Sequence, residues 1–317
     1  MGSGTYPRAT RLASGALLGV YTAFTNGNTV LTTVRSTDNG ATWTQLGSIA
    51  TEVTATHDLD NPFVLQLPSG RVLAAFRNHD RASATARPTF FRITICQSAD
   101  DGATWTFLST AASEANSVNG LWEPFLRNAN DGALQLYYSR ENNASDQDSL
   151  MRISSDGGQT FSSATIISGS ELSAARDGML GVATISGNSL IAVFESEQNG
   201  LFTVNSITSS DDGKTWGNRQ RVYTPIGISN NAGAPQVVNV GGRLVVSFMT
   251  DEDTQLHAWI SGANAKLVVS TDGGGTWGGK TTVSAVQSNW PGMVTIDSSS
   301  LLYMVDFNGV KATRVTL

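Results

Sequence analysis

The sequence has little of what usually marks a redox, metal or membrane protein. Cys96 is the only cysteine among its 317 residues, so no disulfide can form within the chain, and an apolar alternating run around it favours a buried structural thiol. His57, His79 and His257 are widely spaced, which predicts no metal site, and no motif indicates a cofactor. No apolar stretch approaches the roughly 18 residues of a membrane-spanning helix.

Charged residues are also scarce, at 15%, and the formal net charge is -6 without any run of Lys or Arg. Nucleic acids and anionic membranes bind basic stripes, so neither is an expected partner and a neutral ligand is favoured. Glycine is abundant, with 32 residues, which is typical of many tight turns between short strands. We therefore expect an all-β protein that forms a single domain over residues 1–317.

Two short segments of the sequence bear on the cellular location. Met1-Gly2-Ser3-Gly4 is typical of an expression tag, so the lack of a secretory leader carries little weight. Asn143-Ala144-Ser145 matches the acceptor sequence for N-glycosylation, which occurs in secreted proteins. We expect a secreted monomer.

The most informative feature is the pattern S-x-D-x-G-x-T-W/F, which occurs five times at intervals of roughly 55 to 62 residues. The five copies begin at Ser36, Ser98, Ser154, Ser209 and Ser270. In each copy the Asp can accept hydrogen bonds from turn amides and the Gly can adopt a backbone angle closed to other residues. This turn resembles the Asp box of sialidase-type propellers, in which its role is structural.

Between the repeated turns, alternating apolar residues predict four short strands in each interval and no helix. The first strands begin near Tyr6, Asn61, Leu121, Gly178, Gly233 and Gly292. The last interval offers only three strands, at residues 292–296, 301–306 and 310–317, and contains no sixth turn. The pattern predicts a six-bladed β-propeller, sialidase-like, whose sixth blade is incomplete or borrows a strand from elsewhere.

Strand direction then sorts the polar residues by face. The repeated turns join third to fourth strands, so the starts of first strands and the ends of second strands lie on the opposite face, around a central funnel. Sugars bind charged groups through their hydroxyls and aromatic rings through their C–H faces. The candidate substrate-binding residues on that face are Arg8, Asn61, Arg77, Asn78, His79, Trp122, Arg140, Asp177, Glu197, Asn231 and Trp290.

Two glutamates on this face are the candidate catalytic residues. Glu123 lies in the bulky segment Leu121-Trp122-Glu123-Pro124-Phe125, and Glu195 follows the apolar run 190–194, which favours a raised pKa. Glycoside hydrolysis needs such a pair, one carboxylate acting at the anomeric carbon and the other protonating the leaving oxygen. Neighbouring third and fourth blades would bring the two within reach of one bond.

With these residues in place, nearly the whole chain resembles the fungal exo-1,5-α-L-arabinanases of glycoside hydrolase family 93. The segments that carry the resemblance are Tyr6-Pro7-Arg8, Asp60-Asn61-Pro62, Phe76-Arg77-Asn78-His79, Trp122-Glu123-Pro124, Arg176-Asp177-Gly178, Phe194-Glu195-Ser196-Glu197 and Gly233-Ala234-Pro235. The resemblance implies a retaining hydrolase that releases arabinobiose from the non-reducing end of linear arabinan, a neutral plant cell-wall polysaccharide. It also implies Glu123 and Glu195 as the catalytic pair, and we take Glu123 as the nucleophile and Glu195 as the acid/base.

Two alternatives remain. A sialidase would bind a carboxylate through three arginines, and Arg8 and Arg176 could supply two of them, but the expected start of the fifth blade, residues 230–234, contains no arginine. A non-catalytic glycan-binding propeller would suit the repeated turns equally well. The discriminating feature is the pair Glu123 and Glu195, because a binding module has no need for two opposed carboxylates.

Overall fold

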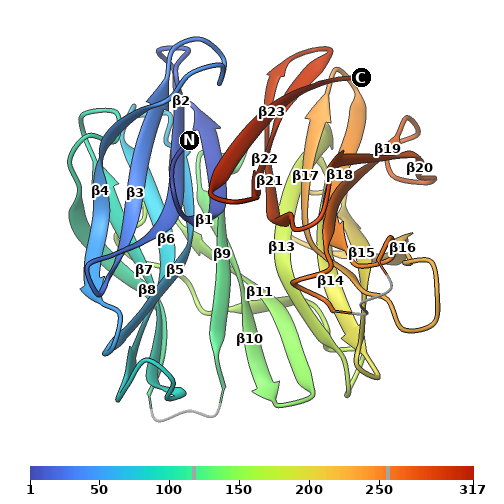
Figure 1. The fold of residues 1–317 in the computed structure, drawn as a ribbon, viewed down its shortest axis with the longest axis horizontal. Coiled ribbons are helices and arrows are strands. Elements are labelled where there is room, and N and C mark those ends of the chain that lie inside the picture. Colours follow the sequence, from blue (N-terminus) through green and yellow to red (C-terminus); the bar gives the residue numbers. More distant parts are fainter. Residues whose placement is uncertain (116–118, 255–257) are drawn as a thin grey trace.

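The computed structural model describes residues 1–115, 119–254 and 258–317, which form 23 β-strands and no helix (Figure 1). No helix able to span a membrane is present among these residues. The strands are grouped into consecutive antiparallel sets in which each strand pairs with the next along the chain. These sets are the blades of the propeller, and they are numbered here from one to six.

Five blades have four strands and the sixth has three, and one parallel pairing between Gln147 and Arg176 joins blades three and four into a continuous sheet. Blades one and two are β1 (Thr5–Arg11), β2 (Leu17–Thr25), β3 (Asn28–Ser36), β4 (Thr44–Val53), β5 (His57–Gln66), β6 (Val72–Arg81), β7 (Pro88–Ser98) and β8 (Thr106–Ala115). Blades three and four are β9 (Leu121–Asn128), β10 (Leu134–Asn143), β11 (Asp146–Ser154), β12 (Thr165–Ser168), β13 (Arg176–Ser186), β14 (Ser189–Gln198), β15 (Leu201–Ser209) and β16 (Gly217–Tyr223). Blades five and six are β17 (Ala232–Val240), β18 (Arg243–Thr250), β19 (Asn264–Ser270), β20 (Gly278–Ser284), β21 (Asn289–Asp297), β22 (Ser300–Asp306) and β23 (Val310–Thr316).

The first strands of the blades form a closed ring, since β1, β5, β9, β13, β17 and β21 each contact the next, and β21 contacts β1. The predicted six-bladed propeller is therefore confirmed. Apolar side chains from adjacent blades fill the spaces between them, as in the cluster that joins Leu73 and Phe91 of blade two to Leu136 and Tyr138 of blade three. This packing fixes the blades as a rigid frame for residues at the centre.

The described part of the sixth blade has no fourth strand, as the spacing predicts. The N-terminal residues instead approach its third strand. Gly2 forms an isolated antiparallel bridge with Val310 at the start of β23, and the amino group of Met1 donates to the Val310 carbonyl oxygen at 3.1 Å. In Figure 1 the blue N-terminus accordingly lies beside the red β23.

The repeated turns have one hydrogen-bond pattern. In the first copy, Ser36 Oγ donates to Asp38 Oδ1 (2.7 Å) and accepts from the Gly40 amide (2.8 Å). Asp38 also accepts from the amide and the hydroxyl of Thr42, and these hydrogen bonds lower its pKa to about 2. The other four copies repeat these four contacts. Gly40 has φ of 88°, which only glycine adopts freely.

Each first strand carries a β-bulge near its start, where one residue with positive φ interrupts the register with the second strand. These residues are Tyr6, Asn61, Glu123, Met179, Ala234 and Trp290, with φ between 42° and 54°. All except Met179 precede a proline. A bulge turns its residue out of the normal alternation and tolerates the missing amide of proline, so the six side chains are aimed differently from the rest of their strands.

Candidate active site

One cavity on the funnel face contains both candidate catalytic glutamates. Its volume is about 250 Å³, and blades two, three and four supply its walls. The lining residues are Arg77, Trp122, Glu123, Glu141, Gln147, Arg176, Glu195 and Phe202. The repeated turns connect third to fourth strands at the other ends of the same blades, so the cavity and the turns lie on opposite faces.

Glu123 is the bulged residue of β9, with φ of 42°. Such a backbone angle costs on the order of 1–3 kcal/mol for a residue other than glycine, and it occurs most often at functional sites. Burial, followed by the nearby charge of Glu195, raises the pKa of the Glu123 carboxyl to about 8, while Arg77 and a hydrogen bond from the Met179 amide oppose the shift. The bulge therefore holds this carboxyl in a place where its neutral form is favoured.

Glu195 lies near the end of β14, on the edge of the same cavity. Its Oε2 accepts a hydrogen bond of 2.6 Å from the amide of Ala234 in the next blade. Burial raises its pKa to about 7, against that hydrogen bond and the charge of Arg176. A Cβ atom on Gly233 would come within 2.5 Å of Glu195 Oε2, so glycine at this position leaves room for the carboxyl.

The two carboxyl groups therefore form a coupled pair. Both pKa values are raised by burial, and the charge on Glu195 makes ionisation of Glu123 harder. When two sites interact in this way, their protons leave in two steps that belong to the pair. The raised pKa values favour retention of a proton by the pair near neutral pH, which acid/base catalysis with two carboxyls requires.

Arg77 borders the Glu123 side of the cavity, where it is held from several directions. Its Nη1 donates to Asn61 Oδ1 at 2.7 Å, and its Nη2 is 3.1 Å from Asp58 and 3.3 Å from Asp60. The guanidinium also lies 5.2 Å from the centre of the Trp122 ring. Arg77, Asn61 and Trp122, three of the predicted substrate-binding residues, are thus brought together beside Glu123.

A second cation lies on the other side of the cavity. Arg176 Nη2 donates to Glu141 Oε1 at 2.8 Å and to Gln147 Oε1 at 2.9 Å. Glu141 also accepts from the Gly120 amide and from Arg87. Burial opposes ionisation of Glu141, but the hydrogen bonds from Arg176 and Gly120 outweigh it and lower the pKa of this carboxyl. None of Glu141, Gln147, Arg176 and Phe202 was among the residues predicted to bind substrate.

Two of these omissions have one cause. The prediction selected Arg140 and Asp177, whereas the cavity is lined by Glu141 and Arg176, which are their direct neighbours. Successive side chains of a strand point to opposite faces, so an error of one residue selects the wrong side. Arg140 instead donates to Asn142 at 3.1 Å, at the end of the β10–β11 hairpin.

Asp177 is fully buried, and this differs from the prediction that it binds sugar hydroxyls. Both of its carboxylate oxygens accept from Arg219 of β16, at 2.6 and 2.8 Å, and the same guanidinium donates to Ser196. This paired geometry satisfies the carboxylate within the protein. Asp177 consequently holds the outer strand of blade four against its inner strands.

His79 differs from the prediction in the same way, because it is completely buried and cannot contact a substrate in this conformation. Its ring meets Phe91 and Trp122 edge-on, with centroids 4.7 and 5.2 Å away. Burial and the charge of Arg77 lower its pKa to about 2, so the imidazole is neutral. His79 therefore packs against the Trp122 ring inside the protein.

The remaining candidates lie outside the cavity lining. Asn78 Oδ1 accepts a hydrogen bond from Arg92 of the neighbouring strand β7. Glu197 Oε1 accepts from the Gly200 amide in a tight turn. Asn231 Oδ1 accepts from the amide of Phe202 and so fixes the chain that carries this lining residue. The other two, Arg8 and Trp290, come together where blades one and six meet.

Arg8 and Trp290 belong to the centre of the ring. Arg8 donates to the carbonyl oxygens of Pro7 and Trp290, and its guanidinium lies 4.0 Å from the centre of the Tyr6 ring. Trp290 packs with Tyr6, Met179 and Ala234, so four of the six bulged residues form one apolar cluster. The bulged residues of blades two and three, Asn61 and Glu123, supply the polar part.

No group of three or more His, Cys, Asp or Glu side chains in the described part of the chain could hold a metal ion. His57 is near the carboxylates of Glu52 and Asp80 on the rim of blade two, and His257 lies outside the described residues.

Comparison with known proteins identifies the fold through solved structures, whereas comparison of the sequence identifies no family. No family model and no curated protein matches the sequence. Among solved structures, a glycoside hydrolase family 93 α-L-arabinofuranosidase of Fusarium graminearum in complex with arabinobiose matches with a TM-score of 0.77 and 22% identity, over 98% of this chain and 92% of that one. A Penicillium chrysogenum α-L-arabinanase complexed with arabinobiose matches with a TM-score of 0.76 and 20% identity, over 99% and 96%.

A sialidase of Streptococcus pneumoniae also matches, with a TM-score of 0.67 and 11% identity, over all of this chain and 69% of that one. The chain has the sialidase-like propeller fold. At these identities the likeness establishes the architecture alone, because this fold can carry different sites. The chemistry of this propeller depends on the residues that line its own cavity.

The raised pKa of Glu123 leads to a prediction about stability. The folded protein binds this proton more tightly than the unfolded chain, so the stabilisation is present at low pH and is lost as pH rises through the folded pKa of about 8. One pKa unit corresponds to about 1.4 kcal/mol. We therefore expect Glu123→Gln to raise the melting temperature at pH 9 by several degrees and to change it little at pH 5.

The check is thermal unfolding of both proteins at the two pH values. Glu114→Gln serves as a control because Glu114 lies in β8, an outer strand away from the cavity. If Glu123→Gln lowers the melting temperature at pH 9, the carboxyl is not held against its ionisation and the description of the pair is wrong.

Proposed function

We propose that this protein is an exo-acting glycoside hydrolase that releases arabinobiose from the non-reducing end of linear α-1,5-L-arabinan with retention of configuration. The observation that carries the proposal is the pair Glu123 and Glu195, two buried carboxyls with raised pKa values in one cavity. Two structures that share the fold are named as an arabinofuranosidase and an arabinanase, and both are complexes with arabinobiose.

In the proposed reaction Glu123 is the nucleophile and Glu195 the acid/base. Glu195 donates its proton to the glycosidic oxygen while a Glu123 oxygen bonds to the anomeric carbon, and the shortened polysaccharide leaves. Glu195 then takes a proton from water, which displaces Glu123 from the sugar and restores both carboxyls. This mechanism requires carboxyl groups about 5–5.5 Å apart. In the free protein the higher pKa, about 8, belongs to Glu123, and that of Glu195 is about 7, so this assignment requires the bound substrate to leave the proton on Glu195.

The walls of the cavity suit an uncharged sugar. Trp122 offers an aromatic ring beside Glu123, and Arg77 provides donors that sugar hydroxyls can accept. Arg176 is already neutralised by Glu141, which makes it a hydroxyl partner rather than a site for an anionic substrate. A volume of about 250 Å³ is below the roughly 300–1,000 Å³ of a typical ligand pocket, so it fits a chain end of one or two rings.

The same features disfavour a sialidase. Only two arginines, Arg77 and Arg176, line the cavity, and both have carboxylate partners. Sialidases use a tyrosine as nucleophile, but Tyr303 is buried in blade six and donates its hydroxyl to the Lys266 carbonyl oxygen at 2.7 Å, so it has a packing role. A purely glycan-binding propeller would gain nothing from two carboxyls whose burial disfavours their charged forms.

The proposal includes the setting in which the protein acts. Arabinan is a plant cell-wall polymer, so we propose secretion to the outside of the cell. We also propose that it acts as a monomer and without a cofactor.

The proposed function is tested by incubating the protein with linear arabinan, a sialoside and a panel of aryl furanosides. We expect arabinobiose as the first and main product from arabinan, detected by chromatography, and no sialic acid. The initial product should have the same anomeric configuration as the substrate, which NMR can follow during the first minutes. Release of sialic acid, or no release of sugar from any substrate, would contradict the proposal.

A further inference from the structure

A second aromatic wall borders the cavity on the Glu195 side. Phe202, at the start of β15, lines the cavity, and the ring of Trp259 stacks on it with centroids 5.5 Å apart and planes at 7°. Trp259 belongs to the connection between β18 and β19, in the neighbouring blade five. Both side chains are partly exposed, so the pair presents an aromatic surface to solvent.

This wall is close to the Glu195 carboxyl. A Cβ atom placed on Gly233 would lie 2.5 Å from Glu195 Oε2 and 3.0 Å from Cζ2 of the Trp259 indole. Gly233 therefore lies between the Glu195 carboxyl and the Trp259 indole, and its lack of a side chain lets both groups approach this position. Trp122, by comparison, stands beside Arg77 and Glu123. Aromatic side chains therefore lie near both glutamates: Trp122 of blade three near Glu123, and Phe202 of blade four with Trp259 of blade five near Glu195.

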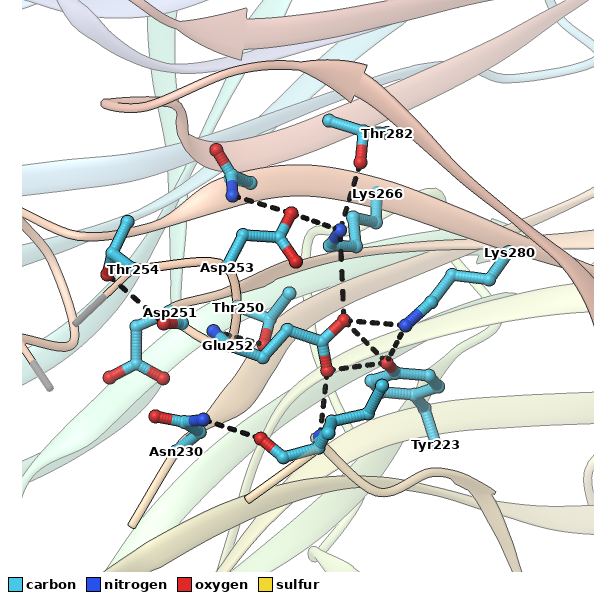
Figure 2. A network of polar contacts seen from close by, with 12 residues as sticks. Tyr223, Asn230, Thr250, Asp251, Glu252, Asp253, Thr254, Lys266, Lys280 and Thr282 are labelled. Atoms are coloured by element: carbon cyan, nitrogen blue, oxygen red, sulfur yellow. Dashed lines mark hydrogen bonds and ion pairs between the residues drawn. The ribbon is translucent and has the colours of Figure 1, made fainter.

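The base of the connection that carries Trp259 is held by an ionic network whose central side chains, Lys266 and Glu252, are buried, whereas Asp253 and Lys280 are partly exposed (Figure 2). Lys266 is almost fully buried between Asp253, whose carboxylate it contacts at 2.5 Å, and Glu252, at 3.7 Å. Glu252 in turn accepts from Tyr223 at 2.6 and 2.7 Å and from Lys280 at 2.9 Å. Buried charges are costly unless they are paired, so such a network fixes one arrangement of the chain.

Hydrogen bonds close the two ends of the connection onto each other. The Asp251 carbonyl oxygen accepts from the amide and the hydroxyl of Thr254, and the Thr254 hydroxyl also contacts the Gly262 carbonyl oxygen. The Gly262 amide donates to the Ala258 carbonyl oxygen at 2.7 Å.

The same connection is linked to the chain that carries Phe202. Asp251 Oδ1 accepts from the Asn231 amide, and Asn231 Oδ1 accepts from the Phe202 amide. Phe202 and Trp259 are therefore positioned by one continuous set of contacts.

We infer that the Phe202–Trp259 wall binds the sugar ring on the leaving-group side of the cleaved bond, the first residue of the polysaccharide that departs. The inference rests on the proposed function, in which Glu195 protonates the leaving oxygen. The acid/base must lie next to that oxygen, so the ring attached to it must lie next to Glu195. A flat aromatic pair at that place contacts the C–H face of the ring and leaves its hydroxyls in water.

The inference is tested with two substrates that share the transferred sugar and differ in the leaving group. One is a linear arabinan oligosaccharide, and the other is arabinobiosyl fluoride, whose leaving group has no ring. For Trp259→Ala we expect kcat/KM on the oligosaccharide to fall about tenfold, the upper range of what aromatic stacking contributes. On the fluoride kcat/KM should stay within about twofold of the parent.

Three further variants control for a loss of structure. Phe202→Leu keeps an apolar side chain and should show the same selective loss, and Trp259→Phe should recover most of the activity on the oligosaccharide. Phe107→Ala removes an exposed aromatic from the outer strand β8 and should change neither rate. Equal losses on both substrates, or no loss on either, would contradict the assignment of the Phe202–Trp259 wall to the leaving group but would not contradict the proposed hydrolase function. A parent protein that cleaves neither substrate would overturn the proposed function and, with it, the wall.

Discussion

Removing the Glu195 carboxyl as Glu195→Ala should lower the turnover of arabinan by about 10²–10⁴-fold, the usual contribution of a general acid/base. Glu123→Ala should cost more, because no covalent intermediate can then form. The two variants should also differ on an aryl glycoside, whose leaving group departs without protonation. Glu195→Ala should still be glycosylated by such a substrate, whereas Glu123→Ala should not.

Sodium azide distinguishes the two roles by stereochemistry. In Glu195→Ala the azide ion should displace Glu123 from the glycosyl-enzyme, and two inversions give a glycosyl azide with the configuration of the substrate. In Glu123→Ala azide should enter through the space left by the nucleophile and displace the leaving group directly, giving the inverted glycosyl azide. NMR of the isolated azides reads both outcomes.

Exchange of the two stereochemical outcomes would assign Glu195 as nucleophile and Glu123 as acid/base. Such a result would also move the Phe202–Trp259 wall away from the leaving group, so the two experiments check each other. Parental activity in both variants would show that the cavity is not the site of hydrolysis. Such an exchange would agree with the pKa values of the free protein, in which Glu123 holds its proton to higher pH than Glu195.

The architecture was predictable from sequence because its signals are local and repeated. Five copies of one turn set the blade length, and each copy forms the same four side-chain hydrogen bonds in the structure. The bulges in the first strands were not predicted: five of the eight prolines follow a bulged residue, but only the structure shows that Pro124 and its counterparts mark these positions.

The candidate site was only partly predictable, because its details depend on side-chain direction and on distant partners. A shift of one residue exchanged Arg176 for Asp177 and Glu141 for Arg140, since neighbouring side chains of a strand face opposite ways. Trp259 gave no signal, because it stands in a connection whose path depends on the packing of blade five. Arg219, on an outer strand, gave no sign that it reaches a residue 42 positions earlier in the chain.

The Asp177–Arg219 pair carries the last prediction, which concerns stability. Arg219→Met removes the bidentate partner of a fully buried carboxylate, and breaking such a pair costs about 3–5 kcal/mol. The melting temperature should fall by roughly 5–15 °C. The double variant Asp177→Leu with Arg219→Met should recover much of this loss, because an apolar pair leaves no unpaired charge in the interior. It should also keep KM close to that of the parent, measured well below its melting temperature. If the double variant is as stable as the parent but has lost affinity for arabinan, Asp177 binds the substrate after all, and its burial in the free protein must be relieved when the sugar enters.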